Sequence, residues 1–191
     1  MGSRVSALGA IIEHMFEQSD ALKHDRLMAA RAALSTVEVR IGTAREGGDK
    51  APLPVAATVA ELLPQGLRRG TVTSVVGSTS LVLALAGEAS RAGSWIAMVG
   101  MPHVGLVAAA RRGIDLARLA LVPHPGTQAA VAAGACLDGM DVVILGGSLA
   151  LSDADRRRLS ARARERGAVL LSSGLPGERP WPGARVELTV E

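Results

Sequence analysis

The turn Gly77-Ser78-Thr79-Ser80 is the first place in this sequence where residue types and spacing could do chemistry. It stands between an apolar run at 71–76 and a second apolar stretch at 81–92. A glycine turn between a strand and a helix is the outline of a phosphate-binding loop. Such a loop needs successive backbone N–H groups around the phosphates, a Lys for the β- and γ-oxygens and a hydroxyl for magnesium.

The glycine spacing and the Lys of such a loop are both missing. No second Gly follows Gly77 at the required distance, and both Lys residues of the chain precede residue 51. The other matching glycine pair, Gly100 and Gly105, is followed by Leu106 and Val107, which offer neither charge nor hydroxyl. We therefore predict a tight strand-to-helix turn at 77–80, with no bound cofactor.

Other catalytic patterns are also incomplete. "GGSLA" at 146–150 matches part of a nucleophile elbow after a strand, but hydrolases of that kind place a His after the Ser. The last His here is His124, so that order cannot occur. His103 and His124 have no nearby Cys or carboxylate pair, so they do not make a metal site. We predict no catalytic residue, no metal and no enzymatic activity.

The elements that must position these residues alternate between strands and helices after residue 50. Apolar runs predict strands at 71–77, 95–100, 119–124, 141–147, 168–174 and 184–190, the last as an edge strand. Helices are expected between them at 80–93, 104–114, 126–140 and 153–166, where Ser152 and Asp155 form the start of the last one. This order predicts an α/β fold with a mostly parallel sheet covered by helices on both faces.

The first 50 residues have a different pattern and are expected to form an arm with a linker. Residues 5–17 carry an apolar face at helical spacing, a second helix is expected to about residue 34, and 36–41 alternate like a short strand. The face and strand are partner-binding candidates through Leu8, Ile12, Met15, Phe16, Val37 and Val39. The arm folds back on its own core or packs on another molecule, and both arrangements stay open.

Two further features are candidates for contacts. The helix at 153–166 is rich in arginine, and it either meets DNA phosphates or an acidic partner, or is a solvated face. The candidate residues for such a contact are Arg156, Arg157, Arg158, Arg162 and Arg164. Trp181, in a Pro- and Gly-rich loop, is either a lid on the core or a contact anchor.

Composition limits the class of protein. The 191 residues have a net charge of +3, and 48% are hydrophobic, which is enough for a sizeable core. The single Cys excludes an intramolecular disulfide, so we expect a reducing, cytoplasmic setting. No apolar run reaches the length of a membrane span, and no membrane association is expected.

From residue 52 on, the chain resembles the core of the RecA recombinase family. "RRGIDLARLALVPHPGTQAAVAAGACLDGMDVVILGG" (111–147) runs parallel to the helix and strand series after the catalytic glutamate of that family. The resemblance implies that this glutamate falls near Met101 and that the magnesium-binding aspartate falls at Gly146, so both acidic positions are lost. It also implies a phosphate loop about five residues too short.

A RecA-like core without ATP chemistry most resembles the ImuA family, in particular the short actinobacterial ImuA′ type. "LLPQGLRRGTVTSVVGSTSLVLALAGEASRAGSWIAMVG" (62–100) and "LSARARERGAVLL" (159–171) carry this resemblance. The family implies a non-catalytic accessory of a translesion mutasome in the SOS response to DNA damage. Its implied partner is ImuB, an inactive Y-family polymerase homologue, and indirectly an error-prone C-family polymerase.

Two rival functions stay open on the sequence. A SulA-like inhibitor that binds the division GTPase also has a RecA-like core without a phosphate loop. The second rival is a RecA-like protein with residual ATP binding. Direct contact with DNA and self-association through the arm are further expectations that the sequence does not decide.

Overall fold

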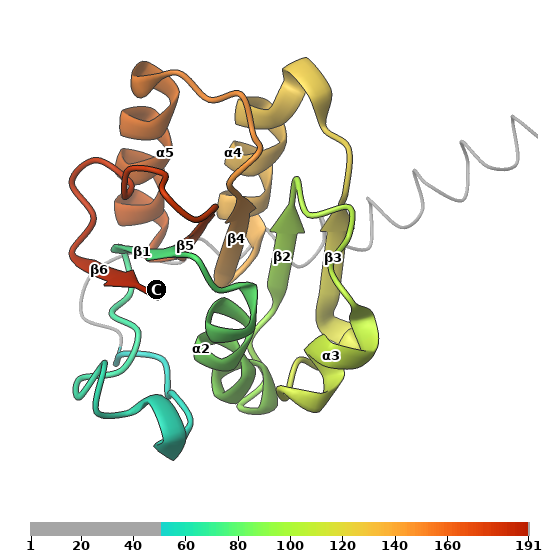
Figure 1. The fold of residues 1–191 in the computed structure, drawn as a ribbon, viewed down its shortest axis with the longest axis vertical. Coiled ribbons are helices and arrows are strands. Elements are labelled where there is room, and N and C mark those ends of the chain that lie inside the picture. Colours follow the sequence, from blue (N-terminus) through green and yellow to red (C-terminus); the bar gives the residue numbers. More distant parts are fainter. Residues whose placement is uncertain (1–50, 191) are drawn as a thin grey trace, which may run out of the picture. The chain divides into compact units, whose positions relative to one another are not determined.

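The strands form a six-stranded sheet in which every neighbouring pair runs parallel (Figure 1). The computed structural model describes residues 51–190, which belong to the second of the chain's two units, 45–191. Across the sheet the strand order is β3-β2-β4-β5-β1-β6. The strands are β1 (Val72–Val76), β2 (Ile96–Val99), β3 (Leu119–Val122), β4 (Val142–Gly146), β5 (Val169–Gly174) and β6 (Val186–Thr189).

Burial differs between the middle and the two edges of this sheet. Strands β1, β2, β4 and β5 are buried along almost their whole length, as expected where helices cover both faces of a parallel sheet. The edge strand β6 instead alternates between half-buried and exposed residues, and the other edge strand, β3, is half-buried with Leu121 exposed. The continuous apolar runs of the sequence thus mark the central strands.

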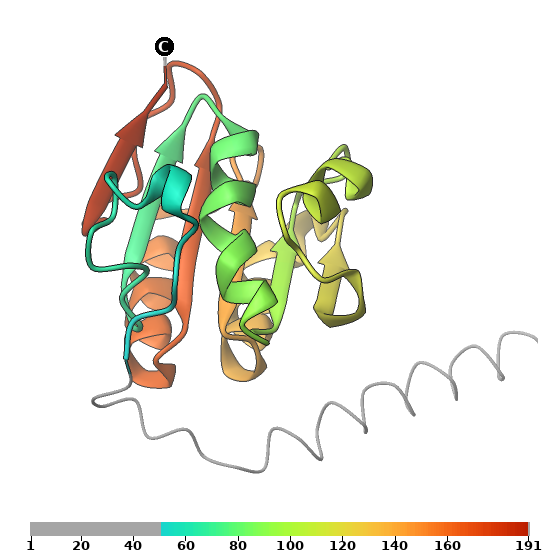
Figure 2. The same cartoon turned by 90° about the horizontal axis from the view of Figure 1, so that it is seen from below.

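Helices pack on both faces of the sheet, so the predicted fold class is confirmed (Figure 2). One apolar cluster joins the sheet to α2, α3 and the segment 53–67, and the other joins it to α4 and α5. The α-helices are α2 (Thr79–Arg91), α3 (Leu106–Arg111), α4 (Ala129–Gly139) and α5 (Asp153–Arg166), and the 3-10 turns are η1 (Ala57–Val59), η2 (Leu116–Arg118) and η3 (Gly126–Gln128).

The helix boundaries follow local signals in the sequence. The predicted start of α5 is confirmed, because Ser152 and Asp155 form a reciprocal capping box and Gly167 ends the helix in the left-handed conformation. Helix α3 is shorter than the predicted 104–114. It begins after Gly105, and Gly113, with φ of 99°, lies just beyond its C-cap. The predicted arm, residues 1–50, lies outside the described residues, and its boundary stays a prediction.

A buried ion pair joins the amino ends of the strands. Asp141, just before β4, is 4% exposed. Its Oδ1 lies 3.1 Å from Nη1 of Arg69, and its Oδ2 accepts a hydrogen bond of 3.0 Å from the backbone N–H of Trp95. Arg69 precedes β1 and Trp95 precedes β2, so one carboxylate holds the starts of three strands in register.

Candidate functional site

The carboxyl ends of the strands are the place to look for a ligand, because open α/β sheets bind ligands there. Strand β1 ends at Val76 and α2 begins at Thr79, so Gly77 and Ser78 alone connect them. The N–H of Gly77 donates to the carbonyl of Gly174 over 3.1 Å, and Ser78 Oγ accepts from the N–H of Leu81 over 3.2 Å. The turn is therefore tight, as predicted, and part of its polar capacity is bonded within the protein.

The end of β6 lies against this turn. Gly77 has φ of 91°, and a β-carbon there would overlap the carbonyl oxygen of Val190. The N–H of Val190 in turn donates to the carbonyl of Val76 over 2.9 Å. A chain segment more than 110 residues away in sequence thus lies beside the turn, where a phosphate loop would need open space. Thr79 and Ser80 are exposed beyond it.

Neither position implied for an acidic residue of ATP chemistry has a carboxylate, and one has no room for a side chain. A β-carbon at Gly146 would overlap the carbonyl oxygen of Gly100, and it would lie 3.2 Å from Cγ of Met101. Gly100, with φ of 71°, is itself covered by the side chain of Leu149. An aspartate at 146 would therefore displace backbone, so the position is closed by packing as well as by residue type.

The carboxylate of Glu178 lies at the same edge. Its Oε2 accepts a hydrogen bond of 2.9 Å from the N–H of Leu175, and β-carbons at Gly147 and Gly174 would come within 2.8 and 3.5 Å of it. This negative charge would oppose a polyphosphate. Among the described residues, no group of three potential metal-ligating side chains comes together.

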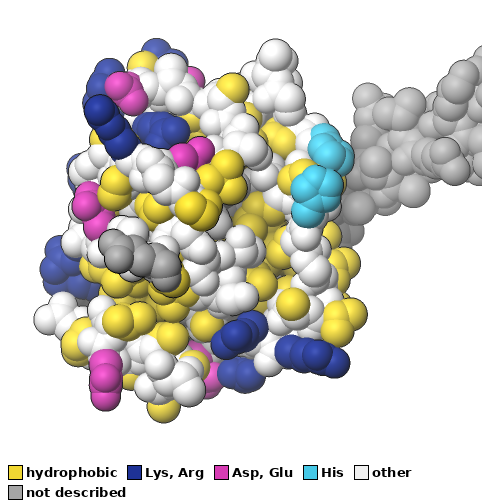
Figure 3. All heavy atoms as spheres, in the orientation of Figure 1, with side chains coloured by type: hydrophobic (Ala, Val, Ile, Leu, Met, Phe, Trp, Pro, Cys, Tyr) yellow, Lys and Arg dark blue, Asp and Glu magenta, His cyan; other side chains and the backbone are white. Residues whose placement is uncertain are grey.

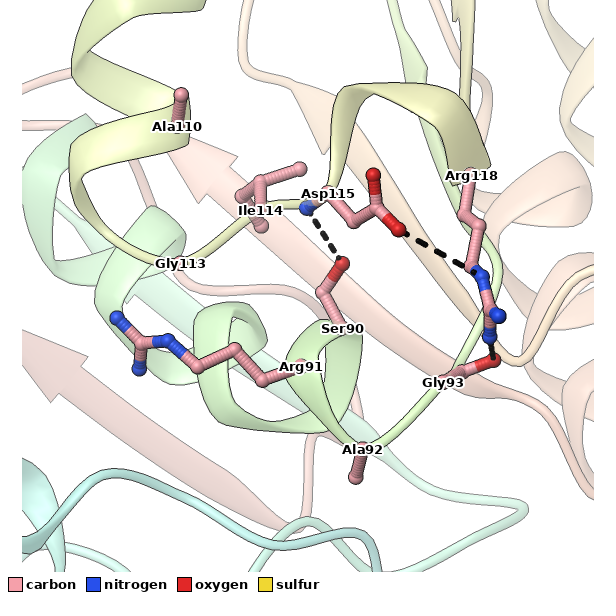
Figure 4. Close-up of a pocket in the computed structure, with 9 residues that line it drawn as sticks. All are labelled: Ser90, Arg91, Ala92, Gly93, Ala110, Gly113, Ile114, Asp115 and Arg118. Atoms are coloured by element: carbon pink, nitrogen blue, oxygen red, sulfur yellow. Dashed lines mark hydrogen bonds and ion pairs between the residues drawn. The ribbon is translucent and has the colours of Figure 1, made fainter.

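A pocket that the sequence did not predict lies at the other end of the sheet, where α2 and α3 end (Figure 4). It is a shallow, open hollow of about 680 Å³ with two arginines in its lining. Both are engaged: Arg91 pairs with Glu88 at 2.8 Å, and Arg118 donates to the carbonyl of Gly93 at 2.7 Å. No sequence signal marks this pocket, because its residues come from the ends of separate elements.

The arginines of α5 do not form one continuous basic surface. Figure 3 shows basic side chains gathered where Figure 1 places α5, with acidic side chains among them. Arg162 and Arg166 both bind Asp138 on α4, through Nε atoms at 2.8 and 3.0 Å. The hydrogen bond from Arg162 holds the pKa of the Asp138 carboxyl below its ordinary value.

The remaining arginines of α5 differ in their contacts. Arg158 lies 3.9 Å from Asp155 and is highly exposed, while Arg156 lies over the ring of Trp181 at 5.1 Å. Arg157 and Arg164 are exposed and make no ion pair with any described residue. Of the five arginine candidates, these two have side chains free for a partner, and they lie two helical turns apart on one face.

Trp181 is buried and covers the core as a lid, which is one of the two arrangements that the sequence left open. Its side chain is 2% exposed. Its Nε1 donates to Ser160 Oγ at 3.0 Å, and its backbone N–H donates to Ser74 Oγ at 2.9 Å. A ring that covers the α5 side of the core in this way has no surface to offer. The arm candidates Leu8, Ile12, Met15, Phe16, Val37 and Val39 lie outside the described residues.

Comparison with known proteins adds three findings. Residues 61–183 match the family described as the MT3502 N-terminal domain. The uncharacterized protein Rv3395c of Mycobacterium tuberculosis is 39% identical over 132 residues, which make up 67% of this chain and 63% of that protein. A crystal structure of the RadB recombinase matches with a TM-score of 0.48 and 18% identity, over 62% of this chain and 67% of that one.

Within the described residues, no helix has the length and apolarity needed to cross a bilayer.

Proposed function

We propose that the chain, a member of the MT3502 N-terminal domain family, is a non-catalytic adaptor of the ImuA′ type, because side chains at Gly77 and Gly146 would overlap backbone carbonyl oxygens at the carboxyl ends of the strands. The observation that carries the proposal is the overlap of any β-carbon at Gly146 with the backbone of Gly100. A protein that kept ATP chemistry would need an acidic side chain at that place.

The proposed role is in protein–protein contacts of a translesion mutasome. The partner is ImuB, and the C-family polymerase is reached through it. This part rests on the sequence resemblance at 62–100 and 159–171. The closed carboxyl edge supports it indirectly, because an adaptor needs a stable scaffold and exposed surface but no ligand crevice.

On the described part of the chain, the proposed contact surface is the outer face of α5. Arg157 and Arg164 are exposed there without a carboxylate partner among the described residues. An acidic partner surface would pair with them, and this pairing would raise mainly the association rate and the specificity of binding. Arg162 and Arg166 would stay on Asp138 and keep α4 and α5 together.

The first experiment is a binding assay with purified ImuB and, in parallel, with the division GTPase. We expect ImuB to bind and the GTPase not to bind. The reverse result would replace the adaptor proposal by the SulA-like one. The double variant Arg157→Glu/Arg164→Glu is expected to weaken ImuB binding about tenfold or more. Its matched control is Arg111→Glu/Arg112→Glu, which changes the same charge at exposed arginines at the end of α3 and should bind like the natural chain.

The second experiment tests residual nucleotide binding directly. A ligand at 100 times its Kd raises the free energy of unfolding by about 2.7 kcal/mol, which thermal unfolding detects readily. We expect no change in Tm with millimolar ATP and magnesium, and no heat of binding in calorimetry. A Tm that rises with ATP concentration would overturn the non-catalytic reading even if ImuB binds.

A further inference from the structure

Two histidines lie on neighbouring loops at the carboxyl edge of the sheet. His103 is in the loop that follows β2, and His124 is in the loop that follows β3. These strands are parallel neighbours, with Val99 opposite Val122. One residue further on, the N–H of Gly100 still donates to the carbonyl of Val122 over 2.9 Å. The two loops therefore leave the sheet at the same place.

The histidine side chains of the described residues gather in one patch on the surface (Figure 3). The patch lies where Figure 1 places the loops beyond β2 and β3, and both His103 and His124 are exposed. The prediction of no metal site at these residues considered each one with its neighbours along the chain, where neither has a Cys or a carboxylate beside it. The fold supplies a neighbour of another kind, because it brings the two histidines to each other.

Prolines restrict the backbone at both histidines. Pro102 and His103 are the central residues of a turn in which the N–H of Val104 donates to the carbonyl of Met101 over 3.2 Å. Proline at the first central position favours such a turn. His124 stands between two prolines, and a proline favours extended backbone for the residue before it. Side chains on restricted loops lose less freedom when they bind a ligand together, which favours binding.

We propose that His103 and His124 together bind a divalent ion of the first transition series, of the class of Cu²⁺, Ni²⁺ and Zn²⁺. Imidazole nitrogen is a preferred ligand for these ions, whereas Mg²⁺ and Ca²⁺ prefer oxygen ligands. Once one imidazole holds the ion, the other is already close on the adjacent loop, so it binds at a high effective concentration. Two protein ligands leave the remaining coordination positions of the ion to water.

This histidine pair is separate from the turn at 77–80. The turn follows β1, and both β4 and β5 lie between β1 and β2 in the sheet. Binding of an ion by the histidine pair therefore needs neither a nucleotide nor the acidic side chains that are absent at Met101 and Gly146. It does not depend on the proposed adaptor function either, so a chain that fails to bind ImuB can still bind the ion.

The test is calorimetric titration of the full chain, free of any affinity tag, with Cu²⁺, Ni²⁺, Zn²⁺ and Mg²⁺. The first three should bind, with Cu²⁺ the tightest, and Mg²⁺ should not. His103→Gln and His124→Gln should each weaken binding about tenfold or more, because even the loss of a group that only supports a ligand costs about 10- to 100-fold in affinity. Both side chains are exposed, so both variants should fold like the natural chain.

Two control variants remove the other soft ligands of the chain. His14→Gln/His24→Gln and Cys136→Ser should each bind like the natural chain; burial raises the pKa of the Cys136 thiol, which disfavours the thiolate that binds metal. Ni²⁺ should raise the Tm of the natural chain and of both controls, but not of His103→Gln/His124→Gln. The proposal would be overturned by the absence of any binding heat at millimolar Ni²⁺. Equal affinity of that double variant and the natural chain would overturn it too, as would loss of binding in either control.

Discussion

The two ends of the parallel sheet are built in different ways. At the carboxyl ends, Gly77, Gly100 and Gly146 lie so close to carbonyl oxygens or to Leu149 that none could carry a side chain without displacing atoms. At the amino ends, the buried carboxylate of Asp141 holds Arg69 and the backbone of Trp95. Around these three glycines the first end is packed with uncharged groups, whereas the second end is joined by a charged group with several partners.

This difference is informative because the carboxyl ends are where α/β proteins usually keep a ligand crevice. A crevice requires unfilled space and polar groups that are not bonded within the protein, and both reduce stability. Here the space is filled by Val190, Leu149 and the backbone. The buried ion pair lies at the opposite end of the sheet, before β1 and β4. Charge at the amino ends is thus structural, and each prediction below tests one part of this contrast.

The largest effect is expected at the amino ends. Asp141→Ala leaves the half-buried guanidinium of Arg69 and the N–H of Trp95 without this acceptor, and breaking a buried pair in this way costs about 3 kcal/mol or more. Urea unfolding measures the loss. The control Asp153→Ala removes an exposed carboxylate from the first turn of α5 and should cost less than about 1 kcal/mol. Equal losses for the two variants would contradict the structural role of Asp141.

A smaller loss is expected at the carboxyl ends. Gly146→Ala must push the backbone of Gly100 aside and should reduce the free energy of unfolding by about 2 kcal/mol. Gly105→Ala is the control, because a β-carbon there meets Ala108 at an ordinary 3.6 Å. If Gly146→Ala were as stable as the control, the carboxyl edge would have spare room, and the comparison between the two ends would fail.

The smallest effect concerns the link between α4 and α5 near the amino ends. Asp138→Asn should reduce stability at neutral pH by about 0.5 kcal/mol, since the pair with Arg162 is partly exposed. Because the pKa of Asp138 is lowered in the folded state, its stabilisation is complete above the pKa of the unfolded chain. It is lost as the pH falls through the folded value.

Acid unfolding of the natural chain and the variant measures this contribution. The two stability curves should converge as the pH falls below the ordinary range of a carboxyl group. A double-mutant cycle with Arg162→Gln isolates the pair from other effects of each change. Curves that stay parallel down to the lowest pH would show that Asp138 does not contribute through its charge.

Much of the fold was predictable because its signals are local. The continuous apolar runs at 72–76 and 142–146 mark buried parallel strands, and Ser152 with Asp155 marks the start of α5. The short turn after Gly77 was also predicted, because only two residues separate the apolar run of β1 from the start of α2. The shorter α3 was not predicted, because its apolar pattern continues past the residues at which the backbone leaves the helix.

The candidate site was less predictable. The roles of Arg162 and Arg156 depend on Asp138 and Trp181, which lie on other elements at least 24 residues away. Helical spacing groups the arginines of α5 into one basic stretch, while their partners divide them into paired and unpaired residues. Trp181 could equally be a lid or an anchor as long as its burial was unknown.

The order of apolar and polar residues by itself determined the α/β class and the sequence of strands and helices along the chain. The composition showed that no lysine follows residue 50. The tertiary structure decided that backbone and side chains lie against Gly77 and Gly146 and that Trp181 is buried. The physical reason is the separation along the chain over which each interaction acts. Periodicity and capping act over a few residues, whereas Val190 meets Gly77, and Gly146 meets Gly100, only after the chain has folded.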